Sequence, residues 1–328
     1  MKAYVIEQPG DADVLQLRDI PSPEPTVGEV LIRVRAFGIN RIDTALRAGR
    51  MGPITEPRVP GIEAVGEVIR DPSGKLSAGQ RVATAMGGLQ FTRNGTYAEQ
   101  VTVLSNNVIA LDDTTLPWEQ LAALPEIYLT VWGALDKNLA IKKGQTLLVR
   151  GGTSAVGLAA ITYAKARGLK VIATTRSAGN SQRLYQVGAD IVVIDDGKIA
   201  PRIREIAPGG VDAALEVVGV VTLLDTLKAV RPFGGVSVVG GLGGTPNLEQ
   251  FNLRGDMPGA VRLSLFPSSL LGTSDLPLED TPLPWLVKEI AAKRIPSINS
   301  RTFAFDEVRQ AHRLIESDRA LGKIVVVL

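Results

Sequence analysis

The chain has 328 residues, 45% of them hydrophobic and 21% charged, with a net charge of +2; this is the composition of a globular protein long enough for two domains. The balanced charge argues against nucleic-acid binding, and the lack of a long apolar segment argues against a membrane span or a secretory signal, so we expect a cytoplasmic protein. With no cysteine and a single histidine, the chain excludes disulfides and thiolate nucleophiles, and nearly excludes a zinc site of nitrogen and sulfur ligands.

Residues 1 to about 124 are predicted to form a β-rich domain. Short runs with β-branched residues, bounded by turn signals such as "DPSGK" and "RNGT", indicate strands. These runs are "EVLIRVRAFGI", "AVGEVI", "QRVATAM" and "YAEQVTV". One helix is predicted at "RIDTALRAG", where Gly49 ends it.

From about residue 125, short buried-type strands alternate with helix-like segments. The strands are "TLLVR", "KVIATT", "DIVVID", "DAALEVV" and "GVSVVG". This alternation predicts an α/β domain with a parallel, doubly wound sheet. After about residue 266 the pattern stops, and we expect the last segments to return to the first domain. They include the strand "GKIVVVL" and an amphipathic helix in which His312 is predicted to be a surface or packing residue rather than a catalytic base.

The run "LLVRGGTSAVGLAA", residues 147–160, predicts a phosphate-binding turn between a strand and a helix. The first glycine permits a tight turn, the last lets helix and strand pack closely, and the helix N-terminus supplies N–H groups to a pyrophosphate. Ser154 stands where a second glycine is usual, and a purely structural turn is the alternative. The predicted cofactor residues of this turn are Gly151, Gly152, Thr153, Ser154, Ala155, Val156 and Gly157.

The end of the next strand favours NADPH over NADH. Folds that bind NAD usually carry Asp or Glu about 20 residues beyond the turn. Here Thr175, Arg176 and Ser177 occupy that place, without a carboxylate. Arg176 can pair with a 2′-phosphate, although a solvated loop residue is the alternative. Asn180, and with less support Arg183, are further candidates for contact with that phosphate.

The later strand ends supply further candidates, because ligands of doubly wound sheets lie outside the carboxyl ends of the strands. The predicted cofactor residues after the fourth and fifth strands are Val217, Val218, Gly219, Val239, Gly240 and Gly241. Glu216 is a charged residue in an apolar strand, and it is predicted to be a paired, buried carboxylate.

Together these segments resemble the medium-chain dehydrogenase/reductase superfamily, specifically its zinc-free quinone oxidoreductase-like branch. The resemblance runs end to end and includes "PSPEPTVGEVLIRVRAFGINRIDT", "LPEIYLTVWGAL" and "ALGKIVVVL". It implies a GroES-like β-rich catalytic domain over residues 1–124 and 267–328, and a Rossmann NADP-binding domain over residues 125–266. It also implies a homodimer that pairs the edge strand at residues 260–266.

The chain departs from zinc-dependent relatives at two metal-ligand positions. Asn40 and Ile62 stand where those relatives have a cysteine and a histidine. Because isoleucine cannot bind a metal, the route in which a metal polarises the substrate oxygen is lost. We therefore expect no metal site.

Three residues match positions at the active site of the family. Asn40 is predicted to donate a hydrogen bond to a substrate carbonyl, with a helix-start role as the alternative. Asp43 also matches a cleft position, but its spacing from Arg47 favours an ion pair within a helix. Thr130 matches a threonine at the nicotinamide end of the cofactor site, with a hydroxyl bonded to its own helix as the alternative. Whether Lys323 reaches the site is left open.

These features predict an enzyme that transfers a hydride from NADPH to a quinone or an α,β-unsaturated carbonyl compound without a metal. Such acceptors delocalise the charge that develops on hydride addition, so orientation and a few hydrogen bonds supply the rate. Two alternatives stay open: a non-catalytic NADPH-binding sensor or interaction protein, and an enoyl-thioester reductase.

Overall fold

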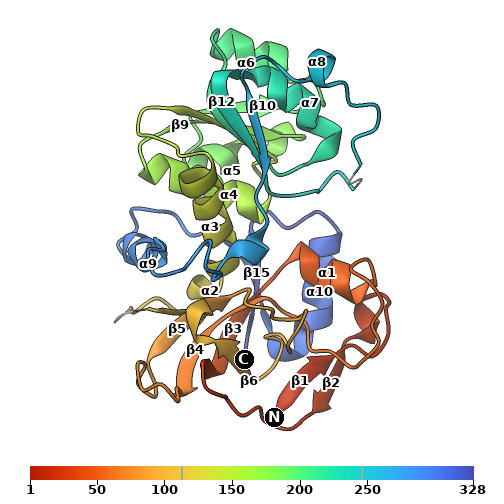
Figure 1. Cartoon of the computed structure of the whole chain (residues 1–328), viewed down its shortest axis with the longest axis vertical. Coiled ribbons are helices and arrows are strands. Elements are labelled where there is room, and N and C mark those ends of the chain that lie inside the picture. Colours follow the sequence, from red (N-terminus) through yellow and green to blue (C-terminus); the bar gives the residue numbers. More distant parts are fainter. Residues whose placement is uncertain (112–113, 245–246) are drawn as a thin grey trace. The chain divides into compact units, whose positions relative to one another are not determined.

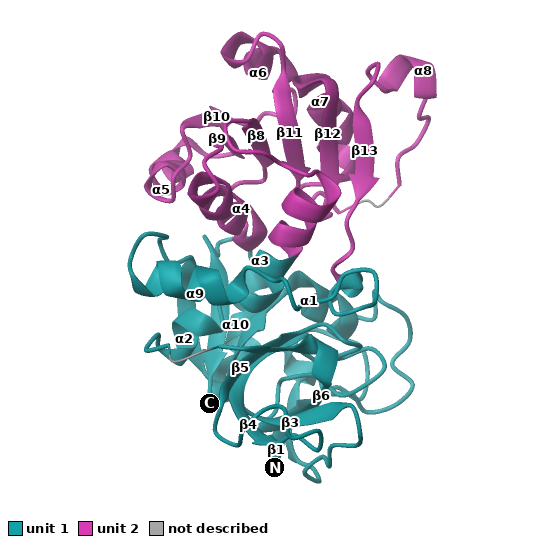
Figure 2. Ribbon diagram, turned by 60° about the vertical axis from the view of Figure 1, so that its left-hand side comes forward, with its two compact units in different colours: residues 1–129, 269–328 teal, residues 130–268 magenta. Residues whose placement is uncertain are grey.

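The computed structural model describes residues 1–111, 114–244 and 247–328, which form two compact units (Figure 2). Unit 1 comprises Met1–Leu129 and Ser269–Leu328, and unit 2 comprises Thr130–Ser268. The boundaries expected from the sequence, after residues 124 and 266, lie a few residues away. Helix α3 (Pro125–Trp132) contains the first division, so a boundary drawn at its start differs from one drawn within it.

Unit 1 is built around a seven-stranded sheet in the order β14-β15-β3-β4-β5-β7, with β6 also paired to β3 (Figure 1). Its strands are β3 (Glu29–Ile39), β4 (Glu63–Arg70), β5 (Arg81–Ala85), β6 (Gln100–Leu104), β7 (Val108–Ala110), β14 (Asn299–Ala304) and β15 (Lys323–Val327), beside a hairpin of β1 (Lys2–Val5) and β2 (Gln16–Asp19). The closing strand β15 pairs antiparallel with β3, with Ile324 opposite Ile39. The C-terminal segment therefore completes the sheet that the N-terminal segment begins.

The helices of unit 1 are α1 (Arg41–Arg47), α2 (Trp118–Leu121), the first part of α3, α9 (Leu283–Ala291) and α10 (Val308–Glu316). Helix α10 is strongly amphipathic, and Val308, Ala311 and His312 on its inner face are buried. These side chains pack into a core that also holds Phe37 and Tyr97, whose rings stack 4.5 Å apart. The packing role predicted for His312 agrees with this position.

Unit 2 contains one parallel sheet in the order β10-β9-β8-β11-β12-β13. Its strands are β8 (Thr146–Arg150), β9 (Lys170–Thr175), β10 (Ile191–Ile194), β11 (Val211–Glu216), β12 (Val230–Val238) and β13 (Arg262–Leu265). Numbered from β8, this order is 3-2-1-4-5-6, the doubly wound order of the Rossmann fold. The predicted α/β fold with a parallel sheet is confirmed.

Helices cover both faces of this sheet, namely α4 (Ala155–Ala166), α5 (Ser181–Gln186), α6 (Ala200–Ile206) and α7 (Val220–Ala229), with a short α8 (Leu253–Asp256) before the last strand. Alternate strand residues such as Leu148 and Ile172 pack with Ile203 of α6 and Leu227 of α7. Ile161 of α4 lies on the other face, against β9. Within the described ranges, no helix has the length and apolar character needed to cross a membrane.

Register brings the strand ends of unit 2 into line. Glu216 of β11 lies opposite both Arg150 of β8 and Val238 of β12, and Val238 lies opposite Leu265 of β13. The segments that follow these strands therefore emerge at one edge of the sheet. The strand order of the sheet reverses direction between β8 and β11. Ligands of such sheets bind outside the carboxyl ends of the strands at that reversal.

Candidate functional site

The turn after β8 has the tight backbone conformation and the close helix–strand packing that its glycines predicted. Gly151 adopts a φ of +88°, a conformation that side-chain-bearing residues rarely adopt. A Cβ on Gly157 would lie 2.3 Å from the carbonyl oxygen of Gly151, so only glycine permits this approach of helix to strand. Both residues are required by the shape of the turn.

Ser154, which replaces the expected glycine, is the N-cap of α4. Its Oγ accepts the N–H of Gly157 at 3.0 Å and donates to the carbonyl of Gly151 at 2.8 Å. Ala155 and Val156 follow in the first turn of the helix, where backbone N–H groups have no acceptor within the helix. These amides and the positive end of the helix dipole form an anion site of the kind that binds phosphate.

The segment after β9 carries the residues predicted to select the coenzyme. Thr175 is buried, and its hydroxyl donates to the carbonyl of Ser177 at 3.2 Å, which shapes the bend. Arg176 and Ser177 are exposed, and Asn180 is half-buried before α5. None of these residues is acidic, so no carboxylate among them repels a phosphate at this strand end.

The segment after β11 is shaped by a buried carboxylate. Glu216 is fully buried, and its Oε1 accepts the N–H groups of Val218 at 2.8 Å and Gly219 at 3.0 Å. Burial raises the pKa of Glu216, although its hydrogen bonds oppose this rise. Gly219 has a φ of +99°, and Gly240 approaches Val217 closely. The predicted pairing of Glu216 is therefore with hydrogen-bond donors of its own loop and with Thr226.

The remaining predicted cofactor residues of unit 2 lie at the same edge of its sheet. Val217, Val218 and Gly219 follow β11, while Val239, Gly240 and Gly241 follow β12. Thr130 belongs to this unit as well, but it is buried within α3 rather than at a strand end. Sequence reasoning missed Arg150, which ends β8 and is fully buried; the signal was a charged residue in an otherwise apolar strand.

In unit 1, Asn40 is part of a buried ionic cluster. Lys323 Nζ lies 2.5 Å from Asn40 Oδ1 and 2.5 Å from Glu63 Oε1, and both charged side chains are at most 1% exposed. Asn40 Nδ2 donates to Glu63 Oε1 at 2.8 Å. A Cβ on Gly38 would lie 2.3 Å from Glu63 Oε1, so this glycine leaves room for the ion pair. Lys323 thus donates a hydrogen bond directly to the side chain of Asn40.

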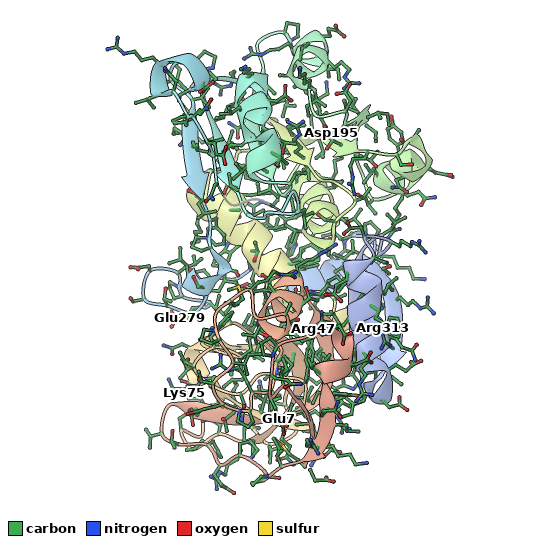
Figure 3. The ribbon with its side chains drawn as sticks, turned by 90° about the vertical axis from the view of Figure 1, so that its right-hand side faces the viewer. Glu7, Arg47, Lys75, Asp195, Glu279 and Arg313 are labelled. Atoms are coloured by element: carbon green, nitrogen blue, oxygen red, sulfur yellow. The ribbon has the colours of Figure 1, made fainter. Side chains whose placement is uncertain are left out.

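Asp43 does not form the ion pair with Arg47 that its spacing suggested. Its Oδ2 accepts the backbone N–H of Asn40 at 2.8 Å and the hydroxyl of Tyr97 at 2.9 Å. Arg47 instead points to Glu316 of α10, at 2.5 Å (Arg47 is labelled in Figure 3). The spacing rule failed because both side chains are buried, and tertiary neighbours replace the partner one helical turn away.

His312 links these two groups. Its Nδ1 lies 3.3 Å from Arg47 Nη1, and its Nε2 lies 3.0 Å from the hydroxyl of Tyr97. Burial and the charge of Arg47 lower the pKa of His312 to about 3, so the ring is neutral near pH 7. Burial raises the pKa of Asp43 to about 7, and its Oδ1 has no hydrogen-bond partner within the described residues.

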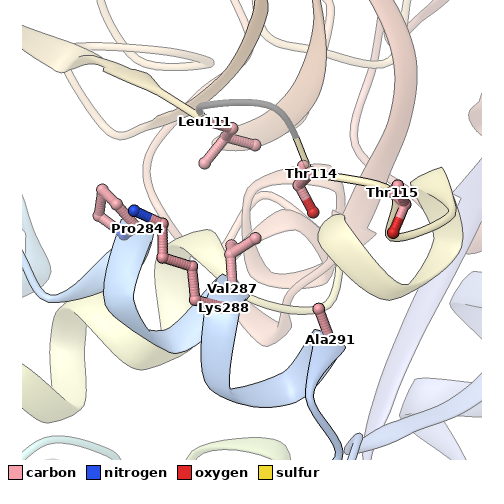
Figure 4. Close-up of a pocket in the computed structure, with 7 residues that line it drawn as sticks. All are labelled: Leu111, Thr114, Thr115, Pro284, Val287, Lys288 and Ala291. Carbon is pink, nitrogen blue, oxygen red and sulfur yellow. The ribbon is translucent and has the colours of Figure 1, made fainter.

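A pocket elsewhere in unit 1 is too small for the predicted coenzyme. It has a volume of about 110 Å³ and lies between the segment before α2 and helix α9 (Figure 4). Its lining residues are Leu111, Thr114, Thr115, Pro284, Val287, Lys288 and Ala291. Ligand pockets usually have volumes of about 300–1,000 Å³, so this one has no room for a dinucleotide.

Comparison with known proteins accounts for both units. Residues 26–113 match the family described as "Alcohol dehydrogenase GroES-like domain", and residues 155–277 match "Zinc-binding dehydrogenase". Quinone oxidoreductase of Salmonella typhimurium is 30% identical, over 97% of each chain. The chain belongs to the medium-chain dehydrogenase/reductase superfamily, in its quinone oxidoreductase-like branch.

Other relatives and solved structures agree with this assignment. Human quinone oxidoreductase is 28% identical over all of this chain and 98% of its own length. The structure of Escherichia coli quinone oxidoreductase complexed with NADPH covers all of both chains, with a TM-score of 0.87 and 26% identity. The GroES-like and Rossmann domains expected from the sequence are therefore confirmed.

The name of one matching family implies zinc, but the residues of this chain do not fit a zinc ion. Zinc in proteins takes three or four ligands from Cys, His, Asp and Glu. The chain has no cysteine, and both ring nitrogens of His312 are engaged by Tyr97 and Arg47. Among the residues whose positions are described, no cluster of three or more ligating side chains could hold a metal. The ammonium of Lys323 already binds both Asn40 and Glu63.

Proposed function

We propose that this protein is an oxidoreductase that uses NADPH to reduce a quinone or an α,β-unsaturated carbonyl compound, without a metal ion. The observation that carries the proposal is the turn at residues 151–157. It combines a left-handed glycine, a close helix–strand approach and a helix N-terminus with unsatisfied amides. Its position at the reversal of strand order is where such sheets bind dinucleotides.

The preference for NADPH rests on the end of β9. Arg176 is exposed and directly follows this strand, in the segment where an NAD-binding fold usually has an acid, and Ser177 adds a second donor. An arginine can grip a phosphate with two N–H groups. Two solved relatives of similar fold are complexes with NADPH.

The reaction needs little activation of the substrate. NADPH, when bound, would supply a hydride, and a quinone or conjugated carbonyl would delocalise the negative charge that the hydride brings. Asn40 is proposed to donate a hydrogen bond to the acceptor oxygen: one of its amide hydrogens faces Glu63, whereas the other makes only a 3.5 Å contact with the carbonyl of Gly38. Asp43 positions Asn40 through its backbone N–H, and Thr130 is proposed to lie by the nicotinamide.

A homodimer is part of the proposal. The expected edge strand at residues 260–266 contains β13, which ends the sheet of unit 2 (Figure 2). An edge strand presents unpaired backbone groups and pairs readily with a second copy of itself.

The substrate class is tested by following NADPH oxidation with 1,4-benzoquinone, 9,10-phenanthrenequinone, 2-alkenals and simple ketones. We expect turnover of the quinones or alkenals and little turnover of the ketones, because only the former delocalise the added charge. Faster reduction of a simple ketone would overturn the proposal. Tight NADPH binding with no turnover of any acceptor would favour a non-catalytic sensor.

The coenzyme preference is tested with Arg176→Ala. We expect this variant to raise the KM for NADPH by about tenfold or more and to leave the KM for NADH unchanged, because a charge-assisted hydrogen bond to the 2′-phosphate is lost. Arg167→Ala, which removes an exposed arginine at the far end of α4, is the control. Equal KM values for the two coenzymes in the wild type would contradict the assignment.

A further inference from the structure

Arg150 is a buried charge that the proposed function does not yet explain. It is the last residue of β8 and directly precedes the turn at residues 151–157, and its side chain is 0% exposed. Arginine is almost never fully buried without partners. Its partners therefore indicate what it does.

Two carboxylates accept hydrogen bonds from the guanidinium. Asp195, at the end of β10 and labelled in Figure 3, accepts two parallel hydrogen bonds of 2.9 Å from Nε and Nη2. Asp225 of α7 accepts from Nη1 at 2.8 Å. Burial by itself would raise the pKa of Asp195, but the hydrogen bonds from Arg150 and its charge hold it below its usual range. The positive charge is thus already neutralised and is not reserved for a phosphate.

One chain of hydrogen bonds runs from this ion pair to the phosphate turn. Asp195 Oδ2 accepts the hydroxyl of Thr174 at 3.3 Å. The same hydroxyl oxygen accepts the backbone N–H of Gly151 at 3.1 Å. Asp195 also donates its backbone N–H to the carbonyl of Thr175, at the start of the segment that holds Arg176. The pair thereby connects the ends of β8, β9 and β10.

A second chain runs to the segment after β11. Arg150 Nη1 donates to Thr226 Oγ1 at 3.0 Å, and the Thr226 hydroxyl donates to Glu216 Oε2 at 2.5 Å. Glu216 Oε1 then accepts the N–H groups of Val218 and Gly219. Glycine is conformationally free, so these two hydrogen bonds favour one conformation of the loop around Gly219, which has a φ of +99°.

We propose that Arg150 is a positioning residue for the coenzyme, holding the phosphate turn through Asp195 and Thr174, and the loop after β11 through Thr226 and Glu216. The inference rests on the proposed function, because it assigns these two loops to the coenzyme. Arg150 acts through backbone N–H groups and not on the 2′-phosphate. It therefore affects NADPH and NADH alike, in contrast to Arg176.

The test cuts each chain of hydrogen bonds separately. Thr174→Val and Thr226→Val remove one hydroxyl each and leave the ion pair of Arg150 and Asp195 in place. Thr162→Val is the matched control, since the hydroxyl of this buried threonine of α4 donates to carbonyls of its own helix. Arg150→Met cuts both chains and is used where it folds.

Two measurements are made on the purified full-length protein. Titration with NADPH and with NADH should give dissociation constants raised about 5- to 10-fold for both coenzymes in Thr174→Val, Thr226→Val and Arg150→Met. Hydrogen exchange of the coenzyme-free protein should rise in residues 151–157 for Thr174→Val and in residues 217–219 for Thr226→Val. It should rise in both segments for Arg150→Met and in neither for Thr162→Val.

The outcomes separate the two proposals. If the wild type binds neither coenzyme, the proposed function is wrong and this inference goes with it. If the wild type binds NADPH but Thr174→Val, Thr226→Val and Arg150→Met behave like Thr162→Val, only the inference is overturned. A change in the ratio of NADPH to NADH affinity would also contradict it, because it would mean that the network acts on the 2′-phosphate.

Discussion

His312 is tied to Asp43 by hydrogen bonds whose direction follows from the groups involved. Arg47 can only donate, so His312 Nδ1 accepts and the ring proton lies on Nε2. That proton is donated to the Tyr97 hydroxyl, which donates in turn to Asp43. With the proton on Nε2, the neutral ring keeps its hydrogen bonds to both Arg47 and Tyr97, and Tyr97 keeps its hydrogen bond to Asp43.

The two titrating groups have opposite effects on stability. His312 has a pKa of about 3 in the folded protein against 6.5 for a free side chain. Its contribution to the free energy of unfolding is therefore complete above pH 6.5 and is lost as the pH falls towards 3. Asp43 has a pKa of about 7 against 3.8, so its contribution is complete below pH 3.8 and is lost as the pH rises to 7.

The variants His312→Gln and Asp43→Asn separate these effects. Relative to His312→Gln, the wild type should lose free energy of unfolding as the pH falls from 6.5 to 4, with a slope of up to about 1.4 kcal/mol per pH unit. Relative to Asp43→Asn, it should lose stability as the pH rises over nearly the same range. Urea denaturation at pH 4, 5, 6 and 7 measures both slopes; curves parallel to the wild type would show that neither group titrates as described.

At the level of elements, the contact between β8 and α4 determines the shape of the phosphate turn. Gly157 lies in the first turn of the helix, where the carbonyl of Gly151 leaves no room for a side chain. Ser154 caps the same helix, which makes a serine as suitable here as the glycine of the usual pattern. Helix start and strand end therefore hold each other in place.

Gly157→Ala tests this contact. The added Cβ must displace backbone, so we expect the free energy of unfolding to fall by about 1–3 kcal/mol and NADPH affinity to fall with it. Gly209→Ala, a glycine of the same unit with open space around its Cβ position, should change stability by no more than about 0.5 kcal/mol. Denaturant titration compares the two variants, and equal effects would mean that the close approach is unimportant.

At the level of the whole molecule, the outer edge of unit 2 exposes apolar side chains. Leu265 on β13 is 70% exposed and Leu263 is 38% exposed. Phe233 is 77% exposed, and its backbone N–H bonds to the carbonyl of Ala260, just before β13 begins. Exposed apolar residues on an edge strand, which has one side unpaired, mark an interaction surface, in keeping with the proposed homodimer.

Leu265→Lys should therefore dissociate the proposed dimer, because it places a charge on the exposed apolar side chains of the edge strand. Sedimentation velocity of the wild type should show a dimer, and of the variant a monomer. Val27→Lys, at an almost fully exposed position of unit 1, should remain dimeric. A monomeric wild type would contradict the homodimer and leave the chemistry of unit 2 unaffected.

Sequence alone predicted the alternation of strands and helices in unit 2, the division into a β-rich and a doubly wound unit, and the turn after β8. These features depend on residues close together in the chain: apolar periodicity selects strand or helix, and glycines and small residues select the turn. The absence of cysteine and the scarcity of histidine also restricted the metal chemistry, because the type of side chain decides which ions a site can hold.

Only the tertiary structure decided which buried charges meet. Lys323 binds Asn40 across 283 residues, and Arg47 takes a partner from α10 rather than from its own helix. Arg150 connects three strand ends that no spacing rule places together. A buried charge must find its partner among whatever side chains the core brings within about 3 Å, and packing of distant segments sets that choice.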